Sequence, residues 1–226
     1  MVSSQWSVTV SSDKVRNTNM RMRKKKNGEA RIAACEEYLI RSADDEKLAG
    51  MLPCELEIGC GKGRFICETG KLNPDKKYIA VELMTDALIT ALELAKSEDV
   101  QNVKFINANA KDLALWFKKG DISVIYLNFS DPWPKAKHAK RRLTFRSFLE
   151  VYKSILADDG KICFKTDNRA LFDFSLEEFR ECGWRLDKVT YDLHNSEWNE
   201  GNVMTEYEKA FSEKGVPINR LEAYIK

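Results

Sequence analysis

The sequence predicts an α/β fold in which helices cover both faces of a largely parallel sheet. Between residues 52 and 183, short apolar runs alternate with segments whose apolar residues recur at helical spacing. Such alternation is typical of right-handed βαβ units, which place successive strands parallel in one sheet. A chain of 226 residues also buries about 70% of its unfolded surface, so it needs no disulfide or metal for stability.

The first half of the predicted fold begins with a helix and then alternates strands with helices. In order, the expected elements are a short amphipathic helix over 29–41, a strand over 52–58, a helix from Arg64, a strand over 77–81, a helix over 84–95, a strand over 103–108 and a helix over 113–117. Each strand is a short apolar run, and each helix repeats apolar residues every three or four positions.

The second half continues the alternation and then changes. The expected elements are a strand over 121–127, a helix with the apolar face Phe145, Phe148, Leu149, Tyr152 and Ile155, a strand over 161–165, a helix over 172–179, and strands over 184–191, 205–212 and 218–225. Asp159-Gly160 and Gly183 are expected to end the two helices. Because no long helix separates the last two segments, we expect an antiparallel hairpin at one edge of the sheet.

The composition indicates one domain with a tail. Residues 1–28 are polar, include the basic cluster 21–26, and are expected to be flexible; translation from Met20 or Met22 would leave most of them out. Residues 29–226 are expected to form a single domain. Because 37 basic and 35 acidic residues leave a net charge of +2, contacts with nucleic acid must come from local clusters.

The same composition limits which cellular compartment and which metal sites are expected. The sequence has no signal-peptide core and no apolar run of membrane-spanning length, so no membrane contact is expected. Its six cysteines form no Cys-x-x-Cys pair and it has only two histidines, which predicts no metal site. Free thiols are typical of a reducing compartment, and we expect a cytoplasmic protein.

A glycine-rich loop follows the strand over 52–58. Its residues are Gly59-Cys60-Gly61-Lys62-Gly63, and a helix starts directly after them. Glycines let the backbone turn sharply and approach a ligand. The dinucleotide fingerprint would need a glycine at Arg64, and Glu57 would repel a pyrophosphate. A carboxylate at residue 57 suits a ligand with an amine or a sulfonium group instead.

Polar residues also end the next two strands. Glu82 lies where an acid binds ribose hydroxyls in such folds, and Asn109 can hydrogen-bond an adenine edge. Together with the glycine loop, these residues predict a site for S-adenosylmethionine rather than NAD.

The most informative segment follows the strand over 121–127. It reads Asn128-Phe129-Ser130-Asp131-Pro132-Trp133-Pro134, followed by the basic run Lys135-Ala136-Lys137-His138-Ala139-Lys140-Arg141-Arg142. The prolines stiffen the backbone around Asp131, and the basic run offers phosphate contacts. Trp133 suits either stacking on a base or packing inside the protein. This combination predicts chemistry on a nucleic-acid base.

Two acids are candidates for that chemistry, and each has a simpler reading. Asp131 can be a turn-forming residue before a proline. Asp167, in Thr166-Asp167-Asn168, can simply cap the helix that follows. We favour Asp131 because of its rigid surroundings.

These motifs resemble the bacterial tRNA (guanine-N7-)-methyltransferase family. The resemblance covers roughly residue 20 to the C-terminus and includes the glycine loop, Val81-Glu82, residues 128–142, Phe164-Lys165-Thr166-Asp167-Asn168, and Met204-Thr205-Glu206-Tyr207-Glu208. It implies a Rossmann-like class I methyltransferase fold with a seven-stranded, mostly parallel sheet and an antiparallel edge. It also implies transfer of a methyl group from S-adenosylmethionine to N7 of guanosine 46 in the variable loop of tRNA, without a metal.

The resemblance assigns roles to single residues. It implies a donor pocket lined by Glu57, Gly59, Gly61, Gly63, Glu82, Asn109 and Asp131, with Asp131 as the catalytic acid. It implies nucleoside contacts by Lys135, Asp167, Thr205, Glu206, Tyr207 and Glu208, and RNA contacts by Lys137, His138, Lys140, Arg141 and Arg142. The family usually has an aspartate where this chain has Asn109, whose carbonyl can still accept from an adenine amine. tRNA is the expected partner, and a homodimer is left open.

The chemistry of guanine agrees with this expectation. N7 carries a lone pair and no proton, so its methylation needs alignment and no general base. A nearby carboxylate stabilises the purine as it becomes cationic. Two alternatives stay open: an N6 or N2 amino-group methyltransferase, whose signature places the aromatic residue after two prolines, and a non-catalytic RNA-binding module.

Overall fold

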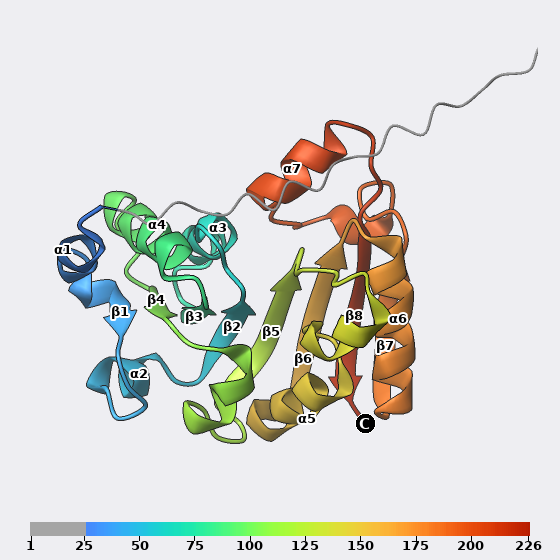
Figure 1. The fold of residues 1–226 in the computed structure, drawn as a ribbon, viewed down its shortest axis with the longest axis horizontal. Coiled ribbons are helices and arrows are strands. Elements are labelled where there is room, and N and C mark those ends of the chain that lie inside the picture. The colour runs from blue at the N-terminus through green and yellow to red at the C-terminus, as the bar shows by residue number, and fades with distance from the viewer. Residues whose placement is uncertain (1–25) are drawn as a thin grey trace, which may run out of the picture.

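The computed structural model describes residues 26–226, and eight strands in this part form one mixed sheet (Figure 1). The strands are β1 (Leu39–Ile40), β2 (Cys54–Ile58), β3 (Tyr78–Val81), β4 (Val103–Ile106), β5 (Ile122–Asn128), β6 (Leu156–Thr166), β7 (Trp184–Thr190) and β8 (Asn219–Ile225). Their order is β1-β4-β3-β2-β5-β6-β8-β7. All pairings from β1 to β6 are parallel, whereas β8 is antiparallel to β6 and β7.

Helices cover both faces of this sheet. The α-helices are α1 (Gly28–Ala33), α2 (Glu46–Met51), α3 (Arg64–Leu72), α4 (Thr85–Ser97), α5 (Arg146–Ile155), α6 (Arg169–Glu181) and α7 (Glu206–Ser212). Short 3₁₀ helices are η1 (Glu36–Tyr38), η2 (Ala110–Leu115), η3 (Ala136–Arg141) and η4 (Glu197–Asn199). In the described part of the chain, no helix is long and apolar enough to cross a membrane.

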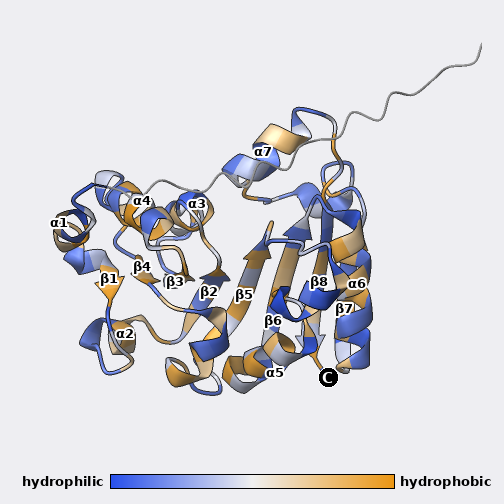
Figure 2. Cartoon of the chain, viewed as in Figure 1, coloured by the Kyte–Doolittle hydropathy of each residue, from blue (hydrophilic) through white to orange (hydrophobic). Residues whose placement is uncertain are grey.

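Two apolar layers hold the helices to the sheet. One layer packs α3 and α4 against β3 and β4, and the other packs α2, α5 and α6 against the opposite face of the sheet. Strand β3 contributes to both, since Ile79 and Val81 face one layer while Tyr78 and Ala80 face the other. This is the alternation that a fully buried strand requires. Figure 2 shows the hydrophobic residues running along the strands between the helices.

The central strand β2 lies between β3 and β5. The chain runs from β2 to β3 and β4 on one side, and then crosses to β5 and β6 on the other side. In open α/β sheets, ligands bind in the crevice beyond the carboxyl ends of strands at such a switch point. The glycine loop follows β2 there, and residues 128–134 follow β5. The topology therefore brings the two motifs of the sequence to one edge.

The predicted fold class is confirmed: the sheet is mostly parallel and has an antiparallel edge. Seven predicted strands are present as β2 to β8, and the eighth, β1, was not predicted. Residues 29–41 were expected to form one helix, but α1 ends at Ala33 and Leu39–Ile40 pair with β4. Tyr38, Leu39 and Ile40 are three consecutive buried residues. Such a run fits a short buried strand better than one apolar face of a helix.

The prediction of a strand over 205–212 was wrong, because these residues form helix α7. The side chain of Thr205 accepts a hydrogen bond from the backbone N–H of Glu208 at 2.9 Å and starts the helix. Thr-x-x-Glu is the sequence signature of such a start, and it outweighs a short alternation of residue types. The antiparallel edge consists instead of β8 and β7. The predicted tail over 1–28 and its basic cluster lie outside the described residues, except for 26–28.

Candidate active site

The glycine loop leaves open space at the carboxyl end of β2. Gly59, Gly61 and Gly63 all have positive φ, at 79°, 56° and 80°. A Cβ on Gly63 would lie 2.7 Å from the Cβ of Ala91, so this glycine allows α3 and α4 to pack. A Cβ on Gly59 or Gly61 would meet no atom within 4 Å. These two glycines therefore line free space that a ligand can fill.

Glu82 holds the glycine loop in place. Its Oε2 accepts from the backbone N–H of Gly61 at 2.8 Å, and its Oε1 accepts from that of Met84 at the same distance. Each carboxylate oxygen can accept a second hydrogen bond. Glu82 can thus fix the loop and still receive the hydroxyls of a ribose.

Glu57 lies deeper at the same edge, only 2% exposed. Asn128 donates to its Oε1 at 3.1 Å, and burial raises the pKa of Glu57 to about 7. Within residues 26–226, Glu57 Oε2, Asn128 Oδ1 and Ser130 Oγ are buried without a hydrogen-bond partner. Buried polar atoms are rarely left unpaired in a native protein. Three of them beside the glycine loop fit a ligand that brings its own donors, such as an ammonium group.

Two cavities meet at Gly59 and Phe129, which line both. The cavity of about 540 Å³ carries Glu82 after β3, Asn109 after β4 and Asp131 after β5. The cavity of about 260 Å³ carries Glu57 and Gly61 on one side and Thr205 and Tyr207 on the other. All seven residues predicted for the donor pocket except Gly63 line these two cavities. Gly63 instead serves the packing of the helices.

The backbone around Asp131 is unusual. Phe129 and Trp133 have φ values of 51° and 41°, in the left-handed region that large side chains rarely adopt. Such conformations persist only where the surroundings fix them, and they gather at functional sites. Asp131 itself is exposed at the mouth of the cavity that also contains Glu82 and Asn109.

Asp167 faces α7 and does not cap the helix that follows it. The cap is Asn168, whose Oδ1 accepts from the backbone N–H of Leu171 at 2.8 Å. The Tyr207 hydroxyl donates to the Asp167 carboxylate, and burial raises the pKa of Asp167 above its usual value. The segment Thr166-Asp167-Asn168 therefore does cap the helix, through Asn168, and this leaves the Asp167 carboxylate for its contact with Tyr207.

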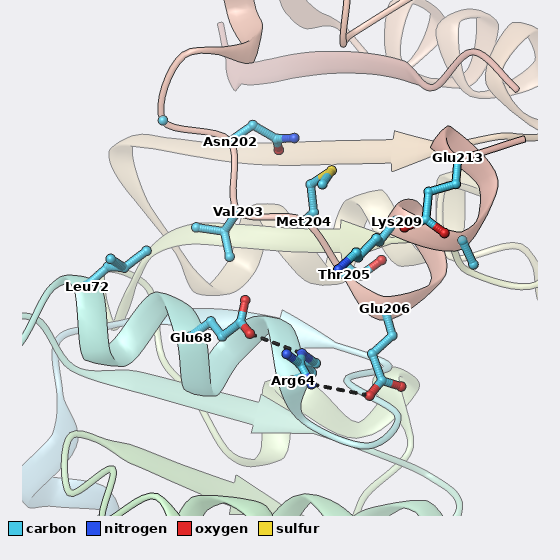
Figure 3. Close-up of a pocket in the computed structure, with 12 residues that line it drawn as sticks. Arg64, Glu68, Leu72, Asn202, Val203, Met204, Thr205, Glu206, Lys209 and Glu213 are labelled. Carbon is cyan, nitrogen blue, oxygen red and sulfur yellow. Dashed lines mark hydrogen bonds and ion pairs between the residues drawn. The ribbon is translucent and has the colours of Figure 1, made fainter. Parts of the chain in front are cut away.

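The four residues 205–208 do not all face one cavity. Thr205, Glu206 and Tyr207 line the smaller cavity, and Glu208 does not. The Glu206 carboxylate lies 3.9 Å from Lys62 Nζ and 3.8 Å from Arg64 Nη1. Glu206 also borders a third cavity of about 680 Å³ between α3 and α7, where it points toward Arg64 (Figure 3). Glu208 is fully buried under α7. In helix α7, Glu208 is therefore turned away from the cavity that the three preceding residues line.

The basic run is also divided. Lys135, Lys137, Lys140 and Arg141 are exposed on and beside η3, and the guanidinium of Arg141 lies 4.8 Å from the centre of the Trp133 ring. His138 is half-buried, with its ring 5.8 Å from that of Trp133. Arg142 turns inward and donates to backbone carbonyls. Trp133 thus has a guanidinium over its ring and an imidazole beside it in a T-shaped arrangement.

Sequence reasoning gave no role to Asn128, Ser130 or Lys165. The signal for Asn128 and Ser130 was their place beside Asp131 in one motif. Lys165 carried the stronger signal, because a lysine in an apolar strand needs a partner when it is buried. In the described residues, no cluster of three or more His, Cys, Asp or Glu side chains could hold a metal.

The fold and the site define an α/β methyltransferase. A solved 16S rRNA methyltransferase, KamB, superposes with a TM-score of 0.60 at 12% identity, over 80% of this chain and 92% of that one. A precorrin-6y C5,15-methyltransferase from Geobacter metallireducens superposes with a TM-score of 0.53 at 13% identity, over 88% and 87%. At such identities the likeness concerns the fold alone.

The sequence narrows the class. A family profile described as "Putative methyltransferase" matches residues 52–221. The tRNA (guanine-N(7)-)-methyltransferase of Geobacillus sp. (strain WCH70) is 48% identical over 90% of this chain and 94% of its own length. Those of Bacillus cytotoxicus and Streptococcus uberis are 45% and 44% identical, over 90% and 91% of this chain. The chain belongs to the tRNA (guanine-N(7)-)-methyltransferase family, as its motifs predicted.

Proposed function

We propose that this chain transfers the methyl group of S-adenosylmethionine to N7 of guanosine 46 in the variable loop of tRNA. Its relatives carry the name of this activity at 44–48% identity. The observation that carries the proposal for the site is the common cavity of Glu82, Asn109 and Asp131, which follow β3, β4 and β5 at one edge of the sheet, beside the basic run. A donor pocket and a nucleic-acid arm thus share one edge of the sheet.

The residues present fit S-adenosylmethionine. The unpaired oxygen of Glu57 suits the amino group of the donor, Glu82 suits its ribose, and the open backbone at Gly59 and Gly61 suits its close approach. Asn109 Oδ1 accepts from the backbone N–H of Lys111 at 3.0 Å and keeps a lone pair for an adenine amine. When bound, the donor supplies an electrophilic methyl carbon.

The acidic side chains act on the purine. Guanine N7 already has its lone pair, so the protein needs to align it and to stabilise the positive charge that develops on the ring. In this proposal Asp131 supplies the stabilising charge. Asp167 and Tyr207, with Thr205 and Lys135, hold the nucleoside. A carboxylate can accept from N1–H and the amino group of guanine, which distinguishes guanine from adenine.

The exposed cations Lys137, Lys140 and Arg141, with His138, bind the phosphates around the target nucleoside in this proposal. Phosphate contacts give affinity without reading sequence. The proposal uses residues of one chain and needs neither a metal nor a second copy. Its substrate and the free cysteines point to the cytoplasm as the working compartment.

The test is incubation of the purified chain with bulk tRNA and labelled S-adenosylmethionine, followed by nucleoside analysis. The expected product is 7-methylguanosine. Label on an exocyclic amine would favour the amino-group alternative. Calorimetry with the donor alone addresses the second alternative, because a pure RNA-binding module would release no heat.

A further inference from the structure

Arg142, the last residue of the basic run, is held differently from its neighbours. Its Nε donates to the carbonyl of Pro132 at 3.1 Å, and its Nη2 donates to the carbonyl of Trp133 at 3.0 Å. The centre of the guanidinium lies 4.3 Å from the centre of the Phe174 ring on α6. Its head therefore bridges the turn after Asp131 and a helix of the core.

The turn after Asp131 needs such support. Pro132 and Pro134 have no backbone N–H, so neither residue can donate a hydrogen bond that would stabilise the turn. Trp133 between them has a φ of 41°, which costs energy for a large side chain and persists only under restraint. The two carbonyls that Arg142 holds belong to the residues that immediately follow Asp131.

We propose that Arg142 is a positioning residue for Asp131 and not a phosphate ligand. Its planar fork fixes two successive carbonyls at once, and the Phe174 ring gives the fork a fixed seat. This inference rests on the catalytic role proposed for Asp131. It divides the basic run by function: Lys137, Lys140 and Arg141 contact RNA, while Arg142 keeps the catalytic turn in shape.

The Arg142→Lys variant separates the two roles. Arg142→Lys keeps the charge, so a phosphate contact would survive, but a single ammonium cannot hold two carbonyls in the geometry of the fork. We expect Arg142→Lys and Arg142→Ala to lower kcat at saturating tRNA by about 10- to 100-fold, the cost of a small misplacement of a reacting group. The Kd for tRNA and its salt dependence stay within about twofold of the original chain.

Lys140→Ala is the matched control, because Lys140 is exposed in the same run. It should weaken tRNA binding and reduce the salt slope by about one unit, which neither Arg142 variant should do. Donor binding by calorimetry and the thermal midpoint report whether each variant is folded. Phe174→Leu removes the ring that packs against the Arg142 guanidinium and changes no charge. It should also lower kcat, but by less than the Arg142 variants do.

The inference is overturned if Arg142→Lys has the original kcat, or if Arg142→Ala loses affinity and salt slope as Lys140→Ala does. If the Arg142 variants do not fold, an unchanged kcat in Phe174→Leu has the same meaning. A failure of the proposed function looks different, since the original chain would then form no 7-methylguanosine.

Discussion

Lys165 Nζ lies 2.7 Å from Glu208 Oε2, and this ion pair joins the end of β6 to α7. The side chains are 8% and 0% exposed. Burial lowers the pKa of Lys165, although Glu208 opposes the shift. Burial also opposes ionisation of Glu208, but Lys165 outweighs it, with help from Asn202 and His194, and holds the pKa of Glu208 below its usual value. Each group therefore favours the charged form of the other.

The other contacts of this pair extend it into a network. Glu208 Oε1 accepts from Asn202 Nδ2 at 2.7 Å and contacts His194 Nε2 at 3.0 Å. Lys165 Nζ also donates to Asn202 Oδ1 and to the Val203 carbonyl, each at 3.0 Å. The network fastens α7 and the loop before it over the crevice, which keeps Thr205 and Tyr207 at the smaller cavity.

We expect Lys165→Met to destabilise the protein by about 3–5 kcal/mol, because it leaves Glu208 buried without a counter-charge. Adding Glu208→Leu should recover part of the loss, since no charge then remains buried without a partner. Urea unfolding measures both. Lys71→Met is the control: it breaks the half-exposed pair with Glu98 and should cost less than about 1 kcal/mol. A Lys165→Met variant as stable as this control would contradict the role of the network.

Asp131→Ala is expected to lower methyl transfer by about 100-fold or more, because it removes the charge proposed to stabilise the cationic purine. tRNA binding should stay within a few-fold, since Asp131 contributes no phosphate contact. Single-turnover transfer and a filter-binding assay measure the two quantities. Turnover close to that of the original chain would refute the assigned role.

Donor binding should depend on pH through Glu57. Because burial raises its pKa to about 7, the free protein is largely protonated there at pH 6 and largely ionised at pH 8. A cationic donor favours the ionised form, so its affinity should rise as the pH rises through 7 and then level off, by up to about tenfold per unit below the pKa. Calorimetry in buffers of different ionisation enthalpy should detect proton release.

Glu57→Gln is the control for this pH dependence. It keeps the shape and removes the titration, so its weaker donor binding should be flat between pH 6 and 8. An affinity of the original chain that does not change over this range would exclude Glu57 as the titrating group.

The exposed cations should set the salt dependence of tRNA binding. Lys137→Ala combined with Lys140→Ala should weaken binding and reduce the slope of log K against log salt by about one to two units. The exposed Lys119, which pairs with Asp158 away from this run, serves as a comparison: Lys119→Ala should leave the slope unchanged. An unchanged slope in the double variant would put the RNA on another surface.

The sequence predicts most of the strands, and it also predicts which residues meet at the carboxyl edge of the sheet, because both depend on local pattern. Glu57, Glu82 and Asn109 each follow or end an apolar strand, and parallel strands bring their carboxyl ends to one edge whatever the details of packing. The cavity that joins Glu82, Asn109 and Asp131 is a consequence of that rule.

The acceptor side is predicted less well because it depends on contacts between distant segments. The alternation of residue types alone predicted a strand over 205–212, although Thr205 and Glu208 form the sequence signature of a helix start. The sequence also cannot tell that Glu208 will meet Lys165, or that Arg142 will turn back to the carbonyls of Pro132 and Trp133. Tertiary packing decides these contacts, and a charged residue within a functional motif can bind another part of the protein instead of the ligand.

The position of β8 between β6 and β7 has a consequence for folding during synthesis. During synthesis β7 emerges before β8 and finds no neighbour in the sheet, since its pairing is with residues 219–225. Until those residues leave the ribosome, the outer side of β6 is an unpaired strand edge, which is prone to association with other chains. The nascent enzyme is therefore most vulnerable just before its last strand arrives, and a chaperone that shields an open edge would help at that moment.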